Sequence, residues 1–110
     1  MALLKDFKTI PDMFLFLTEE YGKTANNYLL KHKVDNEYVG VSFSQFKDET
    51  EQLAMGLAAL GIKSKDKVAI ISENRPEWVY SDIGILSLGA IDVPLYPSLT
   101  ADSIEFILNN

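Results

Sequence analysis

The fold is decided by the stretch from Lys67 to Pro97, which reads KVAIISENRPEWVYSDIGILSLGAIDVPLYP. Two short apolar runs, Val68 to Ile71 and Ile91 to Leu95, flank a periodic segment from Pro76 to Leu88. Short apolar runs of this kind are typical of buried strands, and the segment between them has the length of a helix. The stretch therefore predicts a strand, a helix and a second strand.

A strand–helix–strand unit of this size places its two strands parallel in one sheet, with a right-handed crossover. The sequence therefore predicts an α/β fold built on a parallel βαβ sheet with flanking helices. In sheets of this type, ligands bind beyond the carboxyl ends of the strands. We expect any ligand to lie at Ser72–Asn74 and Tyr96–Ser98.

Two elements are predicted near the amino terminus. Apolar residues recur at helical spacing over Ile10–Tyr21, and Pro11 suits a first helical turn. Asn27–Val34 alternates apolar and polar residues before the polar turn at Asp35–Glu37 and a second short run, Tyr38–Val41. This pattern predicts an amino-terminal β-hairpin.

A second helix is predicted to begin at Phe43, because Ser42 and Gln45 have the spacing of a capping box. Gly61 is expected to end this helix in a left-handed conformation. One apolar stripe is expected to pack on the sheet. It consists of Phe46, Leu53, Leu57 and Leu60.

The helix over Pro76–Leu88 is apolar around most of its circumference, so we expect other elements to cover it on more than one side. Few elements are available to do so, which indicates missing neighbours or self-association. Thr100 is the expected N-cap of a final helix that reaches Asn110. Its predicted buried side consists of Ile104, Ile107 and Leu108.

The composition restricts the partners. A net charge of −6 argues against duplex nucleic acid and anionic membrane surfaces, both of which attract clustered Lys and Arg. The absence of Cys excludes disulfides, thiolate metal sites and Cys nucleophiles, and fits a cytoplasmic protein. No apolar run has the length of a membrane span.

Few residues suggest catalysis. The stretch Gly56–Ser64 misses the phosphate-loop pattern and lies at a predicted helix end, where carbonyl groups point outward. His32 is expected to be a surface residue of the hairpin that faces the opposite strand. Glu73 follows a strand at the ligand side, where a functional acid could sit, but stabilisation by the helix dipole is the favoured explanation. Arg75 is expected to pair with Glu77 or Asp82 rather than to bind an anion.

Two aromatic residues are the candidates for substrate binding. Trp78 lies early in the central helix and Tyr96 at the exit of the second strand, next to Pro97. Either aromatic side chain could line an apolar channel, although such residues more often belong to the core. No residue is predicted to be catalytic or to bind a metal.

Three segments resemble the AMP-binding, or adenylate-forming, enzymes, and most closely the long-chain acyl-CoA synthetases. The first is VSFSQF, the second GLAALGIKSKDKVAIISENRPEW and the third GAIDVPLYPSLTADSIEFIL. The Asn-x-x-Glu-Trp motif at Asn74, Glu77 and Trp78 and the Val93–Pro97 motif point to the long-chain branch. Ser42, Gln45 and Lys65 depart from the family pattern. The resemblance runs from Ile10 to the last residue.

The resemblance implies that residues 1–110 are part of the large amino-terminal domain of a fatty acid CoA ligase. Such an enzyme uses ATP and Mg²⁺ to convert a fatty acid to an acyl-adenylate, which CoA then converts to a thioester. The family's phosphate loop, acidic nucleotide contact and catalytic Lys have no match here. The resemblance therefore implies that this chain binds no cofactor alone and is inactive without the remainder of the parent. It also implies a cytoplasmic parent, either free or peripheral to a membrane.

Two alternatives remain at this point. The chain could be a self-sufficient small α/β module that binds a ligand at Ser72–Asn74. It could also be an interaction domain that forms a homodimer through the helix at Pro76–Leu88.

Overall fold

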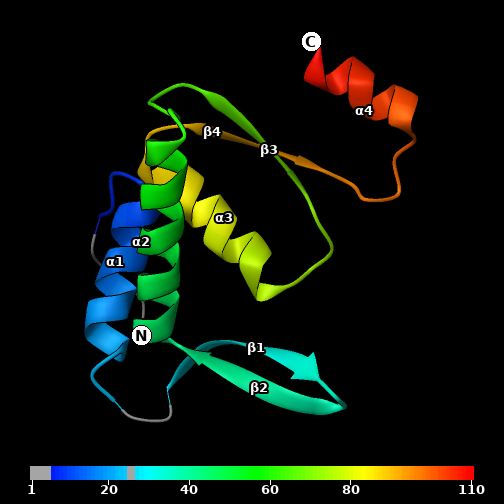
Figure 1. The fold of residues 1–110 in the computed structure, drawn as a ribbon. Coiled ribbons are helices and arrows are strands. Elements are labelled where there is room, and N and C mark those ends of the chain that lie inside the picture. Colours follow the sequence, from blue (N-terminus) through cyan, green and yellow to red (C-terminus); the bar gives the residue numbers. More distant parts are fainter. Residues whose placement is uncertain (1–5, 25–26) are drawn as a thin grey trace. The chain divides into compact units, whose positions relative to one another are not determined.

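The computed structural model describes residues 6–24 and 27–110. Contacts divide the chain into two compact units, Met1–Glu49 and Thr50–Asn110. The elements can be followed in Figure 1, and their order is α1 (Ile10–Tyr21), β1 (Tyr28–Val34), β2 (Glu37–Ser42), α2 (Phe43–Ala59), β3 (Lys67–Ile71), α3 (Pro76–Ser87), β4 (Ile91–Leu95) and α4 (Ala101–Leu108). The predicted α/β fold, with its hairpin and its parallel sheet, is confirmed.

Helix α1 has the predicted bounds. Thr9 is its N-cap, and the Thr9 hydroxyl accepts a hydrogen bond from the Asp12 amide at 3.1 Å. At the other end, the Gly22 amide donates to the Thr18 carbonyl at 2.9 Å. Both ends are therefore stabilised by local hydrogen bonds that need no other element.

Strands β1 and β2 form the predicted antiparallel hairpin. Asp35 and Asn36 occupy its turn with φ values of 49° and 67°. Positive φ at both central residues is typical of a type I′ turn, whose twist matches that of the flanking strands. The turn therefore sets the register in which Val34 faces Glu37.

The core of the first unit is largely aromatic. The rings of Phe14 and Phe46 stack with their centroids 5.5 Å apart, and those of Tyr21 and Phe43 lie 5.9 Å apart. Phe46 is only 2% exposed. Aromatic pairs of this geometry connect α1 to the start of α2 and add to the free energy gained by burial alone.

Helix α2 begins and ends as predicted. The Ser42 hydroxyl accepts a hydrogen bond from the Gln45 amide at 3.0 Å, and Gly61 has φ of 98°. Beyond the helix, the Ile62 amide donates to the Leu57 carbonyl at 3.1 Å. This bond identifies a Schellman motif, in which the residue after the glycine turns back onto the helix.

The Schellman motif corrects one prediction. Leu60 was expected in the packing stripe of α2, but it is 82% exposed. It occupies the cap position, where the chain reverses, and Ile62 packs against the core in its place.

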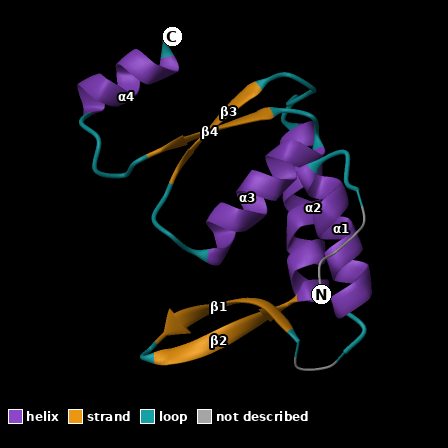
Figure 2. Ribbon diagram, turned by 180° about the vertical axis from the view of Figure 1, so that it is seen from behind, coloured by secondary structure: helices purple, strands orange, loops and turns teal. Residues whose placement is uncertain are grey.

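Strands β3 and β4 are parallel, as predicted, and among the described strands each is hydrogen-bonded only to the other; Figure 2 shows both strands in orange. Ile70, Ile85 and Ala90 form the buried core of this unit, with Leu57 and Val68 packed against them. Helix α3 thus covers the sheet, as a crossover helix must.

Helix α3 is buried on two sides, which confirms that it is covered on more than one side. Ile85 is 1% exposed and faces the sheet core. Gly84 lies on another side, close to the backbone of Thr50 and Ala54 in α2. The sheet and α2 thus cover two different sides of α3, which explains why its apolar residues surround most of the helix.

Helix α4 differs from the prediction. The Thr100 hydroxyl caps it, accepting a hydrogen bond from the Ser103 amide at 3.3 Å. Ile104 and Ile107 are only half-buried, and Leu108 is 57% exposed. The expected burial of Leu108 is therefore wrong, because nothing in the described part of the chain covers this end of the helix.

The connection from α3 to β4 depends on Gly89. Its φ is 72°, and a Cβ atom added there would lie 2.9 Å from the Ser64 hydroxyl. The Gly89 carbonyl accepts a hydrogen bond from the Lys65 amide at 2.9 Å. The glycine therefore both reverses the chain and joins it to the loop before β3.

We predict opposite effects for two glycine-to-alanine substitutions. Gly89→Ala should lower the free energy of unfolding by about 1–2 kcal/mol, because a left-handed alanine is strained. Gly56→Ala should raise it by about 0.5–1 kcal/mol, because Gly56 lies inside α2 with nothing within 4 Å of an added Cβ. Urea unfolding measures both, and equal effects of the two substitutions would contradict the prediction.

Candidate substrate site

A cavity of about 570 Å³ lies where the sequence predicts a ligand, beyond the carboxyl ends of β3 and β4. Eight residues from three segments line it. They are Ser72, Glu73, Asn74, Trp78, Pro94, Leu95, Tyr96 and Pro97. The volume is within the range of small-molecule sites, and ligand binding there stays a prediction.

The parallel sheet is the reason that these segments meet. Ile71 and Leu95 are the last residues of β3 and β4, and they lie opposite each other in the register. The loops after both strands therefore leave from the same edge. Trp78 follows in the first turn of α3, and Tyr96 follows Leu95 directly.

The two aromatic candidates thus line the same cavity, from different elements. Tyr96 is 77% exposed and Trp78 is half-buried. Neither side chain is fully enclosed by the described residues, so each has surface left for a ligand. This arrangement fits an apolar ligand that lies against both rings.

The polar groups of the cavity do not suit a triphosphate. Glu73 is the one charged residue in its lining, and its charge is negative. The Ser72 hydroxyl donates to the Glu73 carbonyl at 2.9 Å. Phosphate binding requires cationic groups or several free N–H groups directed at the ligand.

Residues 6–24 and 27–110 contain no group of three or more His, Cys, Asp or Glu that could hold a metal ion.

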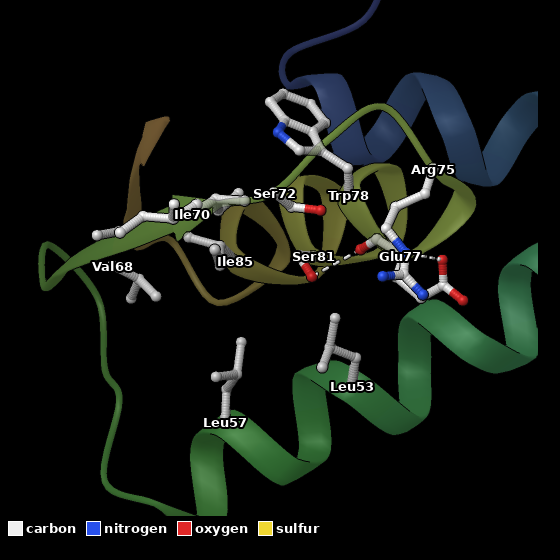
Figure 3. Close-up of a pocket in the computed structure, with 12 residues that line it drawn as sticks. Leu53, Leu57, Val68, Ile70, Ser72, Arg75, Glu77, Trp78, Ser81 and Ile85 are labelled. Carbon is white, nitrogen blue, oxygen red and sulfur yellow. Dashed lines mark hydrogen bonds and ion pairs between the residues drawn. The ribbon is translucent and has the colours of Figure 1, made fainter. Parts of the chain in front are cut away.

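Arg75 forms the predicted ion pair. Its Nε donates to a Glu77 carboxylate oxygen at 2.9 Å, and both side chains are well exposed. The hydrogen bond and the charge of Glu77 raise the pKa of Arg75 above its ordinary value. Arg75 therefore pairs with Glu77 and not with Asp82. Arg75 does not line the candidate substrate site but a second cavity, which Figure 3 shows.

His32 lies in β1 of the first unit, opposite Val39 of β2. The cross-strand position is therefore the predicted one, although the side chain is half-buried rather than on the surface. His32 is not among the residues that line the candidate cavity.

The sequence interpretation missed a pair of acidic residues, Asp82 on α3 and Asp92 on β4. Burial, a hydrogen bond to Asp92 and repulsion by its charge raise the pKa of Asp82 to about 7. Helical spacing offered a signal, because Asp82 stands three or four residues from Trp78, Val79, Ile85 and Leu86. A carboxyl group on such an apolar face is stable only if it is hydrogen-bonded to a partner or protonated.

Comparison with known proteins identifies the family. The family model described as AMP-binding enzyme matches residues 18–110. This chain belongs to the AMP-binding enzyme family. The resemblance predicted from the sequence motifs is thereby confirmed.

Its relatives include long-chain fatty acid ligases. The chain is 35% identical over 107 residues to long-chain-fatty-acid–CoA ligase 5 of Rattus norvegicus, covering 94% of this chain and 15% of that enzyme. It is 28% identical over 92 residues to the long-chain-fatty-acid–CoA ligase FadD15 of Mycobacterium bovis, covering 83% and 15%. The chain therefore spans about 15% of the length of these relatives.

A solved structure supports the same fold for this AMP-binding chain. The fatty acid AMP ligase of Legionella pneumophila superimposes with a TM-score of 0.84 at 20% identity, covering 98% of this chain and 20% of that one. At this identity the match establishes the fold alone. Within the described residues, no helix is long and apolar enough to cross a membrane.

We predict that the Asp82–Asp92 pair makes stability depend on pH. The pKa of Asp82 is raised to about 7 in the folded chain, so the folded chain binds a proton that the unfolded chain has released. The resulting stabilisation is present in full below the ordinary Asp pKa of 3.8 and is lost as the pH rises toward 7. Thermal unfolding between pH 4.5 and pH 8, about the range set by these values, should show this decline.

Asp82→Asn should flatten that decline and raise the midpoint temperature at pH 8, where wild-type Asp82 is charged. Asp48→Asn is the matched control, because Asp48 is exposed on α2. A wild-type slope that survives in Asp82→Asn would show that other groups carry the pH dependence.

Proposed function

We propose that this chain is the amino-terminal scaffold part of a long-chain fatty acid CoA ligase. The observation that carries the proposal is the family match over residues 18–110, together with relatives that are named long-chain ligases. The chain supplies β3, α3 and β4 to the large domain of the complete enzyme. Residues 1–110 are then one segment of a longer domain.

In the complete enzyme, a fatty acid carboxylate attacks the α-phosphate of ATP and displaces pyrophosphate, which gives an acyl-adenylate. The CoA thiol then attacks the acyl carbon, and AMP leaves as the thioester forms. ATP, Mg²⁺ and CoA are the cofactors and substrates of that enzyme. The cationic groups that hold the phosphates would belong to the remainder of the parent chain, and we assign no catalytic residue here.

The role that we propose for this chain's own residues is to form a wall for the acyl group. Trp78 and Tyr96 line one cavity together with Pro94, Leu95 and Pro97. Rigid aromatic and proline surfaces bind a hydrocarbon chain with little loss of side-chain entropy. Glu73 lines the same cavity and would repel the carboxylate group of the fatty acid. The acyl tail of the fatty acid, rather than its carboxylate group, would therefore lie here.

A self-sufficient ligand-binding module is the second candidate. It is favoured by the same cavity, since Ser72 and Asn74 offer hydrogen bonds at a strand edge. A cytoplasmic location, peripheral attachment to a membrane and a homodimer also stay proposals. Stabilisation of the chain by a small polar ligand, without any effect of fatty acids, would favour the module.

We predict that the isolated chain does not catalyse adenylation. Incubation with ATP, Mg²⁺, palmitate and CoA should release no pyrophosphate above a protein-free control. Replacement of the matched segment of rat ligase 5 by residues 18–110 should retain palmitate-dependent pyrophosphate release, because the fold is supplied unchanged. Sustained turnover by the isolated chain would contradict its role as a scaffold, and a folded but inactive chimaera would contradict the family role.

We predict that palmitate changes the fluorescence of Trp78, the one tryptophan in the sequence. Binding against the ring should remove water and shift the emission to shorter wavelength. Tyr96→Ala should weaken this response by about tenfold, which corresponds to the loss of one aromatic contact. Tyr38→Ala is the control, since Tyr38 is 73% exposed on the hairpin. Equal fluorescence responses in the two variants would exclude this cavity as the site of palmitate binding.

A further inference from the structure

A layer of side chains lies directly behind the candidate cavity. Trp78 of α3 and Pro94 of β4 both line the cavity. Asp82 follows Trp78 by four residues on the helix, and Asp92 precedes Pro94 by two residues on the strand. Four helical residues advance by about 6 Å and two strand residues by about 6.6 Å, so the two steps nearly match. The two Asp residues therefore form the next layer between the same two elements.

The strand register directs Asp92 toward α3. Val68 and Ile70 of β3 lie in the core around Ile85 of α3, and Figure 3 shows all three side chains. Asp92 lies beside Val68 in the parallel register, and Pro94 lies beside Ile70. Neighbouring side chains of paired strands point to the same face of a sheet. Asp92 and Pro94 therefore both face α3.

The carboxyl groups of Asp82 and Asp92 meet across this interface. A hydrogen bond joins them, and both side chains are half-buried. A carboxyl group can donate a hydrogen bond only while it is protonated, so this bond exists while the two groups share a proton. Once the proton is lost, two like charges face each other where partial burial weakens screening by water. The contact is therefore attractive in one protonation state and repulsive in the other.

Asp92 is the charged group of the sheet that faces Asp82. Because Val68 points to α3, Lys67 points to the opposite face of the sheet. The Asp66 carboxylate, in the loop before β3, accepts a hydrogen bond from a backbone amide of its own turn at 2.9 Å. Among the described charged residues, Asp92 is the one whose charge raises the pKa of Asp82.

The other elements at this interface leave the carboxyl pair to itself. Helix α2 approaches α3 with Thr50, Leu53 and Ala54, none of which is charged. In the first turn of α3, Arg75 and Glu77 form an ion pair with each other. The charge state of the pair therefore depends mainly on its own two carboxyl groups.

The packing of α3 on the sheet is tightest at the end away from the cavity. There Ile85 is 1% exposed and Ala90 is 5% exposed. At the cavity end, Trp78 is half-buried and Pro94 is exposed. Regions with fewer buried contacts open at a lower cost in free energy. The cavity end is thus the part of this interface that can open while the core holds.

We propose that the contact between the Asp82 and Asp92 carboxyl groups sets the width of the candidate cavity. While the two groups share a proton, they hold α3 against β4 and keep Trp78 close to Pro94. When the proton is lost, repulsion separates the two elements and widens the cavity. An apolar ligand then loses contact with one wall, because dispersion attraction falls steeply with distance.

This regulation rests on the proposed role of the cavity as a wall for the acyl group. Asp82 and Asp92 are positioning residues in that role, because they act on the ligand through Trp78 and Pro94. Affinity for an apolar ligand should therefore fall as the pH rises through the pKa of Asp82, which is about 7.

Acrylamide quenching of Trp78 fluorescence tests the width of the cavity without a ligand, because Trp78 is the one tryptophan in the sequence. Quenching of the full chain is measured at about pH 6 and about pH 8.5, on either side of the pKa of Asp82. The quenching constant should be about twofold higher at the higher pH, because opening exposes the indole ring.

Two substitutions identify the groups that titrate. Asp82→Asn and Asp92→Asn should each remove the pH dependence and keep the low quenching constant, because an amide donates to the remaining carboxylate at either pH. His32→Gln is the control, since histidine side chains ordinarily titrate near neutral pH and His32 belongs to the hairpin of the first unit. It should leave the pH dependence unchanged. Circular dichroism shows whether each variant is folded.

Dodecanol tests the consequence for binding, because its hydroxyl group does not titrate in this pH range. Binding is measured from the emission of Trp78 at the same two pH values. The dissociation constant should rise by about threefold to tenfold from the lower to the higher pH in the wild-type chain, which corresponds to the partial loss of one aromatic contact. In Asp82→Asn it should stay constant.

The outcomes separate this regulation from the acyl wall itself. Equal quenching of the wild-type chain at both pH values would overturn the regulation, as would a pH dependence that persists in both Asp variants or disappears in His32→Gln. Dodecanol binding that is equally tight at both pH values would also overturn it, while the acyl wall would stand. Absence of dodecanol binding at either pH, with quenching that still depends on Asp82, would instead overturn the acyl wall and support the control of cavity width.

Discussion

The parallel pairing of β3 with β4 is the constraint on which the second unit depends. Two parallel strands cannot be joined by a tight turn, so the chain has to cross the sheet as α3 before it returns. The hydrogen bond from the Ile91 amide to the Asp66 carbonyl, at 2.7 Å, lies beside the first register pair, which is Lys67 with Ile91. Gly89 makes this start possible, because its positive φ brings the chain back beside the loop that precedes β3.

The candidate site is a consequence of that pairing. Parallel strands end at the same edge, so Trp78 and Tyr96 line one cavity although they belong to different elements. The candidate substrate site thus follows from one topological fact.

The acidic pair shows how packing changes the chemistry of ordinary residues. Asp82 and Asp92 lie ten residues apart in the sequence, and the helical spacing that sets Asp82 among apolar residues does not name Asp92 as its partner. The packing of α3 on β4 brings the two side chains together, and partial burial, with the hydrogen bond and the charge of Asp92, raises the pKa of Asp82 to about 7. A carboxyl group that shares a proton across this contact couples helix packing to pH.

The sequence by itself determined the elements, the parallel sheet and the family. The signals for these are local or periodic, such as the caps at Ser42 and Thr100 and the two apolar runs around α3, and they do not depend on distant residues. Only the tertiary structure decided that Ile62 rather than Leu60 reaches the core, that Phe14 stacks on Phe46, and that Asp82 meets Asp92. The physical reason is that burial, ring stacking and proton sharing depend on where two separate elements meet, and periodicity within one element gives no information about that.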